Sequence, residues 1–122
     1  MNYFCDLDDP PSAFKETMRR ARTAHRCSEC RSTIHPGETY EHVWGVWGGD
    51  VDTFKTCPTC LSLRNWVVAH IPCFCWNYKS MRADAHQAVA DVLADEHVPG
   101  MFMEFGRLWV ACKRRAAQEG KA

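Results

Sequence analysis

Apolar residues near the start of the chain recur at helical spacing. Phe14, Met18 and Ala21 stand four and then three residues apart, which would place them on one face of a helix. Asp9, followed by two prolines, suits the N-cap and first turn of such a helix. The pattern therefore predicts an N-terminal helix over 9–25, with an arginine-rich face opposite the apolar one.

Apolar residues continue at helical spacing in three later segments. One begins near Pro58, and Pro72 would end it because proline cannot continue a helix. The other two form a C-terminal helical pair over 80–117, in which Pro99 and Gly100 separate one helix from the next.

A stretch between the first two helical segments is typical of a β-hairpin. β-branched and aromatic residues are frequent in Thr39–Trp47, and the chain returns over Val51–Thr56 after a pair of glycines that favours a reversal. Helices and a hairpin together predict an α+β fold, and the chain length predicts a single domain over 1–122.

Two Cys-x-x-Cys pairs flank this hairpin. Cys27 and Cys30 precede it, and Cys57 and Cys60 follow it at the start of the next helix. Paired thiolates at this spacing are typical ligands of tetrahedral zinc, so the sequence predicts one structural Zn2+ bound by these four cysteines. Such a closed site leaves no position for water or substrate, and it would stabilise the fold without Lewis-acid chemistry.

The chain has eight cysteines, which could instead form disulfides. The first residues carry three aspartates and no basic stretch, so we expect no secretion signal. No apolar run approaches the roughly 20 residues that a membrane span needs, so we expect no membrane insertion. A cytoplasmic protein is therefore predicted, and reducing conditions in the cytoplasm favour metal binding over disulfides.

Four further cysteines lie outside the two pairs. Cys73 and Cys75, with His70 nearby, could bind a second metal ion together with Cys5 or Cys112. No second pair at ligand spacing accompanies them, so the favoured interpretation is that they are small buried apolar residues.

The chain has a tight turn that carries the first cysteine pair (the knuckle, Cys27–Cys30), then a hairpin, then a helix that carries the second pair. This order resembles the treble-clef zinc fingers, which include LIM-like and GATA-like fingers. The chain is also similar to small zinc-finger-like proteins of bacteriophages and prophages. That similarity rests on three motifs: Arg22-Thr-Ala-His25-Arg-Cys27-Ser-Glu-Cys30, Ile34-His-Pro-Gly37-Glu-Thr-Tyr40 and Thr53-Phe-Lys-Thr-Cys57-Pro-Thr-Cys60. It implies zinc binding and a viral or prophage origin, and it implies no particular activity.

The resemblance also implies a domain organisation. A treble-clef module over 26–70 would form the centre of the single domain. The N-terminal helix over 9–25 and the C-terminal helical pair over 80–117 would pack against this module.

The net charge is zero, but the charged residues are segregated along the chain. Six basic and two acidic side chains fall within 15–31, five acidic and no basic ones within 84–104, and five basic and one acidic within 105–122. Each group could be the solvated face of a helix or part of a binding surface. The candidate surface for a partner comprises Arg19, Arg20, Arg22, Arg26, Trp44 and Trp47.

Three functions follow from these residues. The first is binding of a protein without catalysis, since interfaces favour aromatic residues and arginine; a viral origin would make the partner a host enzyme or defence component in the host cytoplasm. The second is binding of DNA or RNA through the arginines and tryptophans, against which the zero net charge argues. The third is a metal-dependent nuclease, but His42 and His70 lack the companions of a catalytic site, and we expect no enzyme.

Overall fold

A computed structural model of the protein describes residues 13–71, 74–95 and 100–119. Its elements confirm the predicted α+β class. None of the helices in these ranges has an apolar stretch long enough to cross a membrane. The elements in chain order are β1 (Ala13–Arg20), β2 (His25–Arg26), β3 (Thr33–Ile34), β4 (Thr39–Trp47), β5 (Asp50–Thr56), α1 (Pro58–His70), α2 (Met81–Asp95) and α3 (Met101–Glu119).

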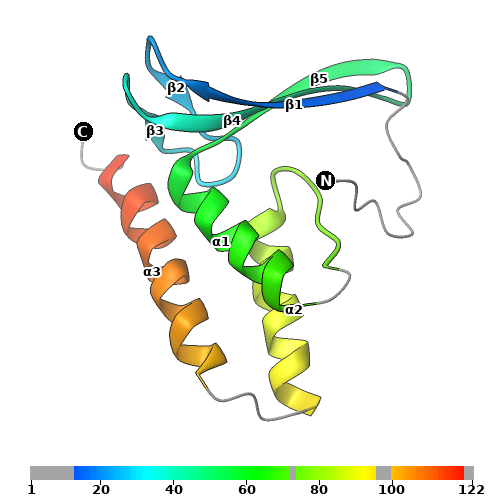
Figure 1. The fold of residues 1–122 in the computed structure, drawn as a ribbon, viewed down its shortest axis with the longest axis vertical. Helices are drawn as coiled ribbons and strands as arrows, with labels where there is room; N and C mark the ends of the chain where they lie inside the picture. The colour runs from blue at the N-terminus through cyan, green and yellow to red at the C-terminus, as the bar shows by residue number, and fades with distance from the viewer. Residues whose placement is uncertain (1–12, 72–73, 96–99, 120–122) are drawn as a thin grey trace.

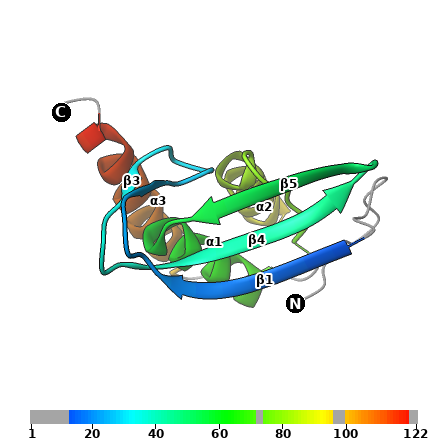
Figure 2. The ribbon, with the colours of Figure 1, turned by 90° about the horizontal axis from the view of Figure 1, so that it is seen from above.

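The strands form two antiparallel sheets. The larger sheet has the order β1-β4-β5, and the smaller one is a short ribbon of β2 and β3. The predicted hairpin is confirmed as β4 and β5, which pair from Glu41 opposite Thr56 to Trp47 opposite Asp50. All three helices lie on one side of the larger sheet (Figures 1 and 2), and α2 and α3 confirm the C-terminal helical pair.

The predicted helix over 9–25 is wrong where the structure describes it, because Ala13–Arg20 is the strand β1. Phe14 and Met18 stand four residues apart, and this spacing puts two side chains on one face of a strand as well as of a helix. β1 pairs with β4 over its whole length, so tertiary hydrogen bonds outweigh the helix propensity of its charged residues. The part of the predicted helix before residue 13 lies outside the described residues.

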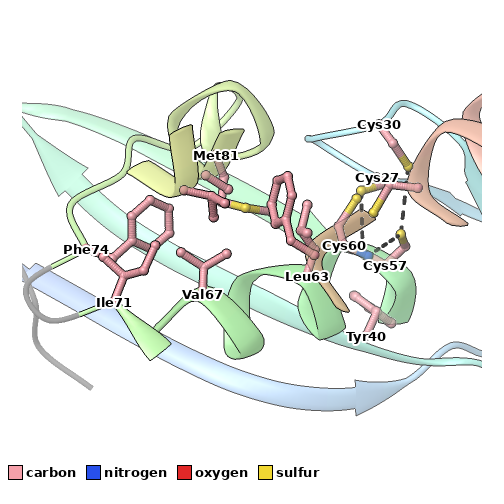
Figure 3. Packing of buried hydrophobic residues seen from close by; sticks show 14 of the residues in the cluster. Cys27, Cys30, Tyr40, Cys57, Cys60, Leu63, Val67, Ile71, Phe74 and Met81 are labelled. Carbon is pink, nitrogen blue, oxygen red and sulfur yellow. Dashed lines mark hydrogen bonds between the residues drawn. The ribbon is translucent and has the colours of Figure 1, made fainter. Parts of the chain in front are cut away.

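Helix α1 occupies the centre of the hydrophobic core. Its inner face buries Leu63 and Val67, and α2 packs beside it through Met81 and further apolar side chains (Figure 3). Helix α3 completes the core with Met101, Phe105 and Cys112. The spacing that predicted these helices also predicted most of their buried positions, but His70 and Phe102, which the same spacing puts on the inner faces, are exposed.

A buried ion pair joins α1 to the sheet. The guanidinium of Arg64 donates to both carboxylate oxygens of Glu41 on β4, at 2.8 and 2.6 Å. The side chains of Arg64 and Glu41 are only 6% and 7% exposed. The guanidinium carbon of Arg64 lies 5.3 Å from the centroid of the Trp76 ring. Burial lowers the pKa of Arg64, but the hydrogen bonds to Glu41 outweigh it and raise this pKa overall. Arg64 is therefore charged, and the hydrogen-bonded carboxylate of Glu41 balances that charge.

Replacing Glu41 alone should be more harmful than replacing the pair. Glu41→Leu leaves the guanidinium buried without its carboxylate, and we expect a loss of about 3–5 kcal/mol in the free energy of unfolding. The double variant Glu41→Leu/Arg64→Met removes both charges and should recover a large part of that loss. Urea unfolding of the metal-loaded proteins measures both values. Equal losses in the single and double variants would contradict this view of the ion pair.

Candidate metal centre

Four buried cysteines from two distant parts of the chain meet at one point. The Sγ atoms of Cys27, Cys30, Cys57 and Cys60 all lie within 4.8 Å of one another, and all four are free thiols (Figure 3). The Cys30 and Cys57 sulfurs are 3.7 Å apart. Four sulfurs bound about 2.3 Å from a tetrahedral zinc ion would stand about 3.8 Å apart. The cluster therefore has the size and the ligand chemistry of a site for a single metal ion.

The first pair lies in the turn of the ribbon formed by β2 and β3. Cys27 closes this turn twice: its N–H donates to Ser32 O at 2.9 Å, and its carbonyl accepts from Arg31 N at 3.0 Å. Arg31 adopts a left-handed backbone with φ 63°, which lets the chain reverse directly after Cys30. A ribbon of only two residue pairs thus holds both sulfurs on the same side of the turn.

The second pair is set by the start of α1. Cys57 is the N-cap residue, in extended conformation, and its sulfur accepts from Cys60 N at 3.4 Å. Pro58 occupies the first turn, where a missing N–H has no cost. Cys60 follows one turn into the helix, and the positive end of the helix dipole favours thiolates at both positions.

Further donors surround the sulfurs. The Cys27 sulfur accepts from the N–H groups of Glu29 and Cys57, both at 3.4 Å. The Cys30 sulfur lies 3.0 Å from the hydroxyl of Ser32. These contacts compensate part of the negative charge that four thiolates would bring to a buried place.

The four thiols differ in their affinity for protons. The pKa of Cys30 is held far below its ordinary value because Cys27, and then Cys57 and Cys60, can donate to its thiolate. The pKa of Cys60 is raised, with Cys112 as the first cause and the three other cluster thiols next. Contacts with Cys27 and Cys30 also raise the pKa of Cys57. Without a cation the cluster therefore retains protons, and a bound metal ion would displace them.

The two residues between Cys27 and Cys30 tie the knuckle to other elements. Ser28 pairs with Lys55 at the end of β5: its N–H donates to Lys55 O at 2.7 Å, and its hydroxyl accepts from Lys55 N at 3.0 Å. Glu29 is buried, and its carboxylate accepts from Lys79 N at 2.7 Å and Met81 N at 3.1 Å. Glu29 thereby caps the start of α2, although 50 residues separate it from Lys79.

Arg115 ties α3 to the same site. It donates to Ser32 Oγ at 2.9 Å, to Thr33 O at 2.9 Å, and to the two carboxylate oxygens of Glu38 at 2.6 and 3.0 Å. The hydrogen bonds to Glu38 raise the pKa of Arg115. Because Ser32 accepts from Arg115, its own hydroxyl proton is directed to the Cys30 sulfur. Arg115 is thus a fixed positive charge one residue away from the thiolates.

Sequence reasoning did not find Glu29, Ser32 and Arg115. The signal available for Glu29 was its place inside a Cys-x-x-Cys pair, which usually exposes the intervening side chains to solvent. Arg115 stood in a basic segment of α3 that is equally typical of a solvated helix face. Only the packing of α2 and α3 against the knuckle distinguishes these residues from their neighbours.

The other cysteines and histidines lie as follows. Cys112 is buried beside Cys60, with its thiol 3.6 Å from the carbonyl of Thr59. His70 stacks on Trp66 with 4.2 Å between ring centroids, and its Nδ1 lies 2.7 Å from the Trp66 carbonyl. Cys75 is disulfide-bonded, so it is not free to bind the predicted second metal ion, and Cys5 and Cys73 lie outside the described residues.

The structure separates the residues of the candidate partner surface. Arg19 and Arg20 are neighbours on β1, so their side chains point to opposite faces of the sheet. Trp44 is 40% exposed, whereas Trp47 packs in a group with Phe14, Phe54 and Tyr78. Arg22 follows β1 in a bend, and Arg26 lies on β2. On the larger sheet, Arg19 is therefore on the opposite face from Arg20, and Trp44 on the opposite face from Trp47.

Comparisons of the chain with protein-family models, with curated proteins and with solved structures found no match. The function is therefore inferred from the residues of this chain and their arrangement.

A substitution that exchanges one carboxylate oxygen of Glu29 for an amide nitrogen tests whether Glu29 caps α2. Glu29→Gln keeps the shape but offers one acceptor oxygen to two N–H donors, so one of them loses its partner. We expect a loss of about 1–3 kcal/mol in the free energy of unfolding, and faster hydrogen exchange at the amides of Lys79 and Met81. Glu104→Gln, an exposed change in the first turn of α3, is the matched control. Equal exchange at Lys79 and Met81 in Glu29→Gln and the wild type would disprove the cap.

Proposed function

We propose that the protein is a structural zinc module, in which one Zn2+ bound by Cys27, Cys30, Cys57 and Cys60 connects the ribbon to α1. The observation that carries this proposal is the convergence of four buried, free sulfurs within 4.8 Å. Four soft thiolates in tetrahedral arrangement select zinc or iron among the common metals, and zinc adds no redox chemistry. When bound, the ion supplies folding energy and completes the fold.

The treble-clef resemblance belongs to this proposal. The chain follows the order of a knuckle at Cys27–Cys30, a hairpin of β4 and β5, and a helix that begins at Cys57. In this arrangement the metal joins the knuckle to the start of α1. The strand β1 and the helices α2 and α3 are then additions around a zinc-binding centre.

We infer that the module acts by binding and not by catalysis. All four tetrahedral positions would be taken by cysteines, which leaves none for a substrate or an activated water. Thiolates engaged with a metal are also poor candidates for nucleophiles. The functional surface should then lie away from the metal, on the outside of the sheet or the helices.

A protein partner is one candidate for this binding, favoured by apolar side chains on α3. Phe102 is 70% exposed and Met103 is 62% exposed, although both are large apolar residues. Exposed aromatic and methionine side chains are enriched where proteins bind one another. If the similarity to phage and prophage proteins reflects origin, that partner is a host protein. Loss of a host protein from pull-downs with Phe102→Ser/Met103→Ser, but not with Glu104→Gln, would support it.

Removal of the metal should unfold the centre of the protein. We expect native mass spectrometry of the purified protein to find one zinc ion, and a chelator to abolish the near-ultraviolet circular dichroism. Binding free energies of about 10–16 kcal/mol for structural zinc are as large as the whole free energy of unfolding of an ordinary domain, about 5–15 kcal/mol. Cys57→Ser should mimic the chelator, whereas Cys112→Ser should keep the ion. A metal-free protein that is folded and indifferent to chelators would refute the proposal.

Metal binding should also depend steeply on pH. Because the pKa values of Cys57 and Cys60 are raised, these thiols hold their protons at neutral pH until the ion displaces them. Protons compete with the metal, so the apparent affinity should rise with pH by more than about tenfold per pH unit. Competition with a zinc indicator, corrected for the protonation of the indicator, at pH 6, 7 and 8 measures this slope. An affinity that does not change over this range would contradict coordination by several thiolates.

A further inference from the structure

One face of the larger sheet carries none of the described helices, and we call it the open face (Figures 1 and 2). The strand register identifies its residues, because residues directly opposite one another point to the same side. Lys15 lies opposite Trp44 and Trp44 opposite Thr53, in a row across all three strands. The next row along the strands comprises Thr17, His42 and Lys55, and Arg19 follows on β1 opposite Tyr40.

The acidic residues of the three strands all lie on one face of the sheet, and three of the four lysines and arginines lie on the other; the fourth, Arg20, is on the helix side opposite Thr39. The register places every acidic residue on the helix side: Glu16 opposite Val43, Glu41 at the ion pair with Arg64, Asp52 opposite Gly45 and Asp50 opposite Trp47. The open face has Lys15, Arg19 and Lys55 and no carboxylate from these strands. A solvated sheet face normally mixes both signs, so a uniformly basic one indicates an anionic partner.

Trp44 stands in the middle of this basic face. It lies on the central strand, between Lys15 and Thr53, and it is 40% exposed. Trp47, three residues later on the same strand, is on the helix side instead, where it packs against Phe54 with ring centroids 5.5 Å apart. The Trp44 ring therefore keeps an accessible apolar surface, and cations lie on the strands beside it.

The neighbours of His42 on this face include the positively charged side chains of Arg19 and Lys55. Burial and then the positive charges of Arg19 and Lys55 lower the pKa of His42. The ammonium of Lys55 lies 3.1 Å from Nδ1 of His25, so its hydrogen-bond partner here is an imidazole and not a carboxylate. An anion placed over this row would gain from several cations and meet no carboxylate from the three strands.

We propose that the open face binds single-stranded nucleic acid, with a base stacked on Trp44 and the phosphates held by Lys15, Arg19 and Lys55. Exposed aromatic rings on a flat sheet suit the free faces of unpaired bases, and flanking cations suit the backbone. A duplex hides its base faces, and an acidic protein would need the cations but not the ring. This proposal names a partner for the binding module proposed above, and it depends on the sheet rather than on the identity of the metal.

The test uses fluorescence anisotropy with labelled 15-nucleotide single strands of RNA and of DNA, and with a 15-base-pair duplex. The full chain, checked for metal content, is titrated at two salt concentrations. Lys15→Glu/Arg19→Glu reverses two charges on the open face. Arg107→Glu/Arg114→Glu, at exposed positions of α3, makes the same change in net charge elsewhere and is the matched control. Trp44→Ala removes the stacking surface, and its thermal unfolding and metal content are compared with the wild type.

We expect single strands to bind more tightly than the duplex, with an affinity that falls as salt rises. The open-face charge reversal should weaken binding by more than tenfold and the α3 control by less than threefold. Trp44→Ala should weaken single-strand binding by about 5–100-fold, as loss of one base stack would do. Relative affinities for RNA and DNA show which is the preferred strand.

Three results would overturn the proposal: no binding of the metal-loaded protein at low salt, equal losses in the two charge reversals, or equal affinity for the duplex with no effect of Trp44→Ala. Metal content is measured independently in every sample. A metal-free but folded protein that still binds single strands would sink the zinc proposal and leave this one standing.

Discussion

The convergence of four sulfurs between a short ribbon and the first turn of α1 is the contact on which this fold depends. The knuckle is small, yet each of its residues is connected to a different part of the molecule. Its two cysteines meet the start of α1, Ser28 pairs with β5, and Glu29 caps α2. Arg115 adds α3 through Ser32. A metal ion at this point would therefore fix the relative positions of the sheet and all three helices.

The two faces of the larger sheet differ in the side chains that they carry. On the helix side, Glu41 pairs with Arg64, and Val43 and Phe54 join the buried residues. The same three strands place lysines, an arginine and Trp44 on the other side. Since successive side chains of a strand point to opposite faces, one sequence can carry a core pattern and a surface pattern at once. The acidic residues on the helix side keep the open face uniformly basic.

The parts of the structure predicted from the sequence are those with a strong local pattern. The Cys-x-x-Cys spacing identified the four clustered cysteines, and the apolar spacing identified α1, α2, α3 and most of their buried positions, with His70 and Phe102 as exceptions. β1 could not be predicted in this way, because Phe14 and Met18 fit both periods and its pairing partner begins about 20 residues later. The tertiary roles of Glu29 and Arg115 depend on segments more than 45 residues away, and no local pattern encodes them.

X-ray absorption at the zinc edge of the purified protein tests the central claim most directly, because it reports the atoms around the ion. This account predicts one zinc ion per chain surrounded by four sulfur atoms at about 2.3 Å. A first shell of nitrogen or oxygen atoms, fewer than four sulfurs, or a folded protein without a bound metal would contradict it.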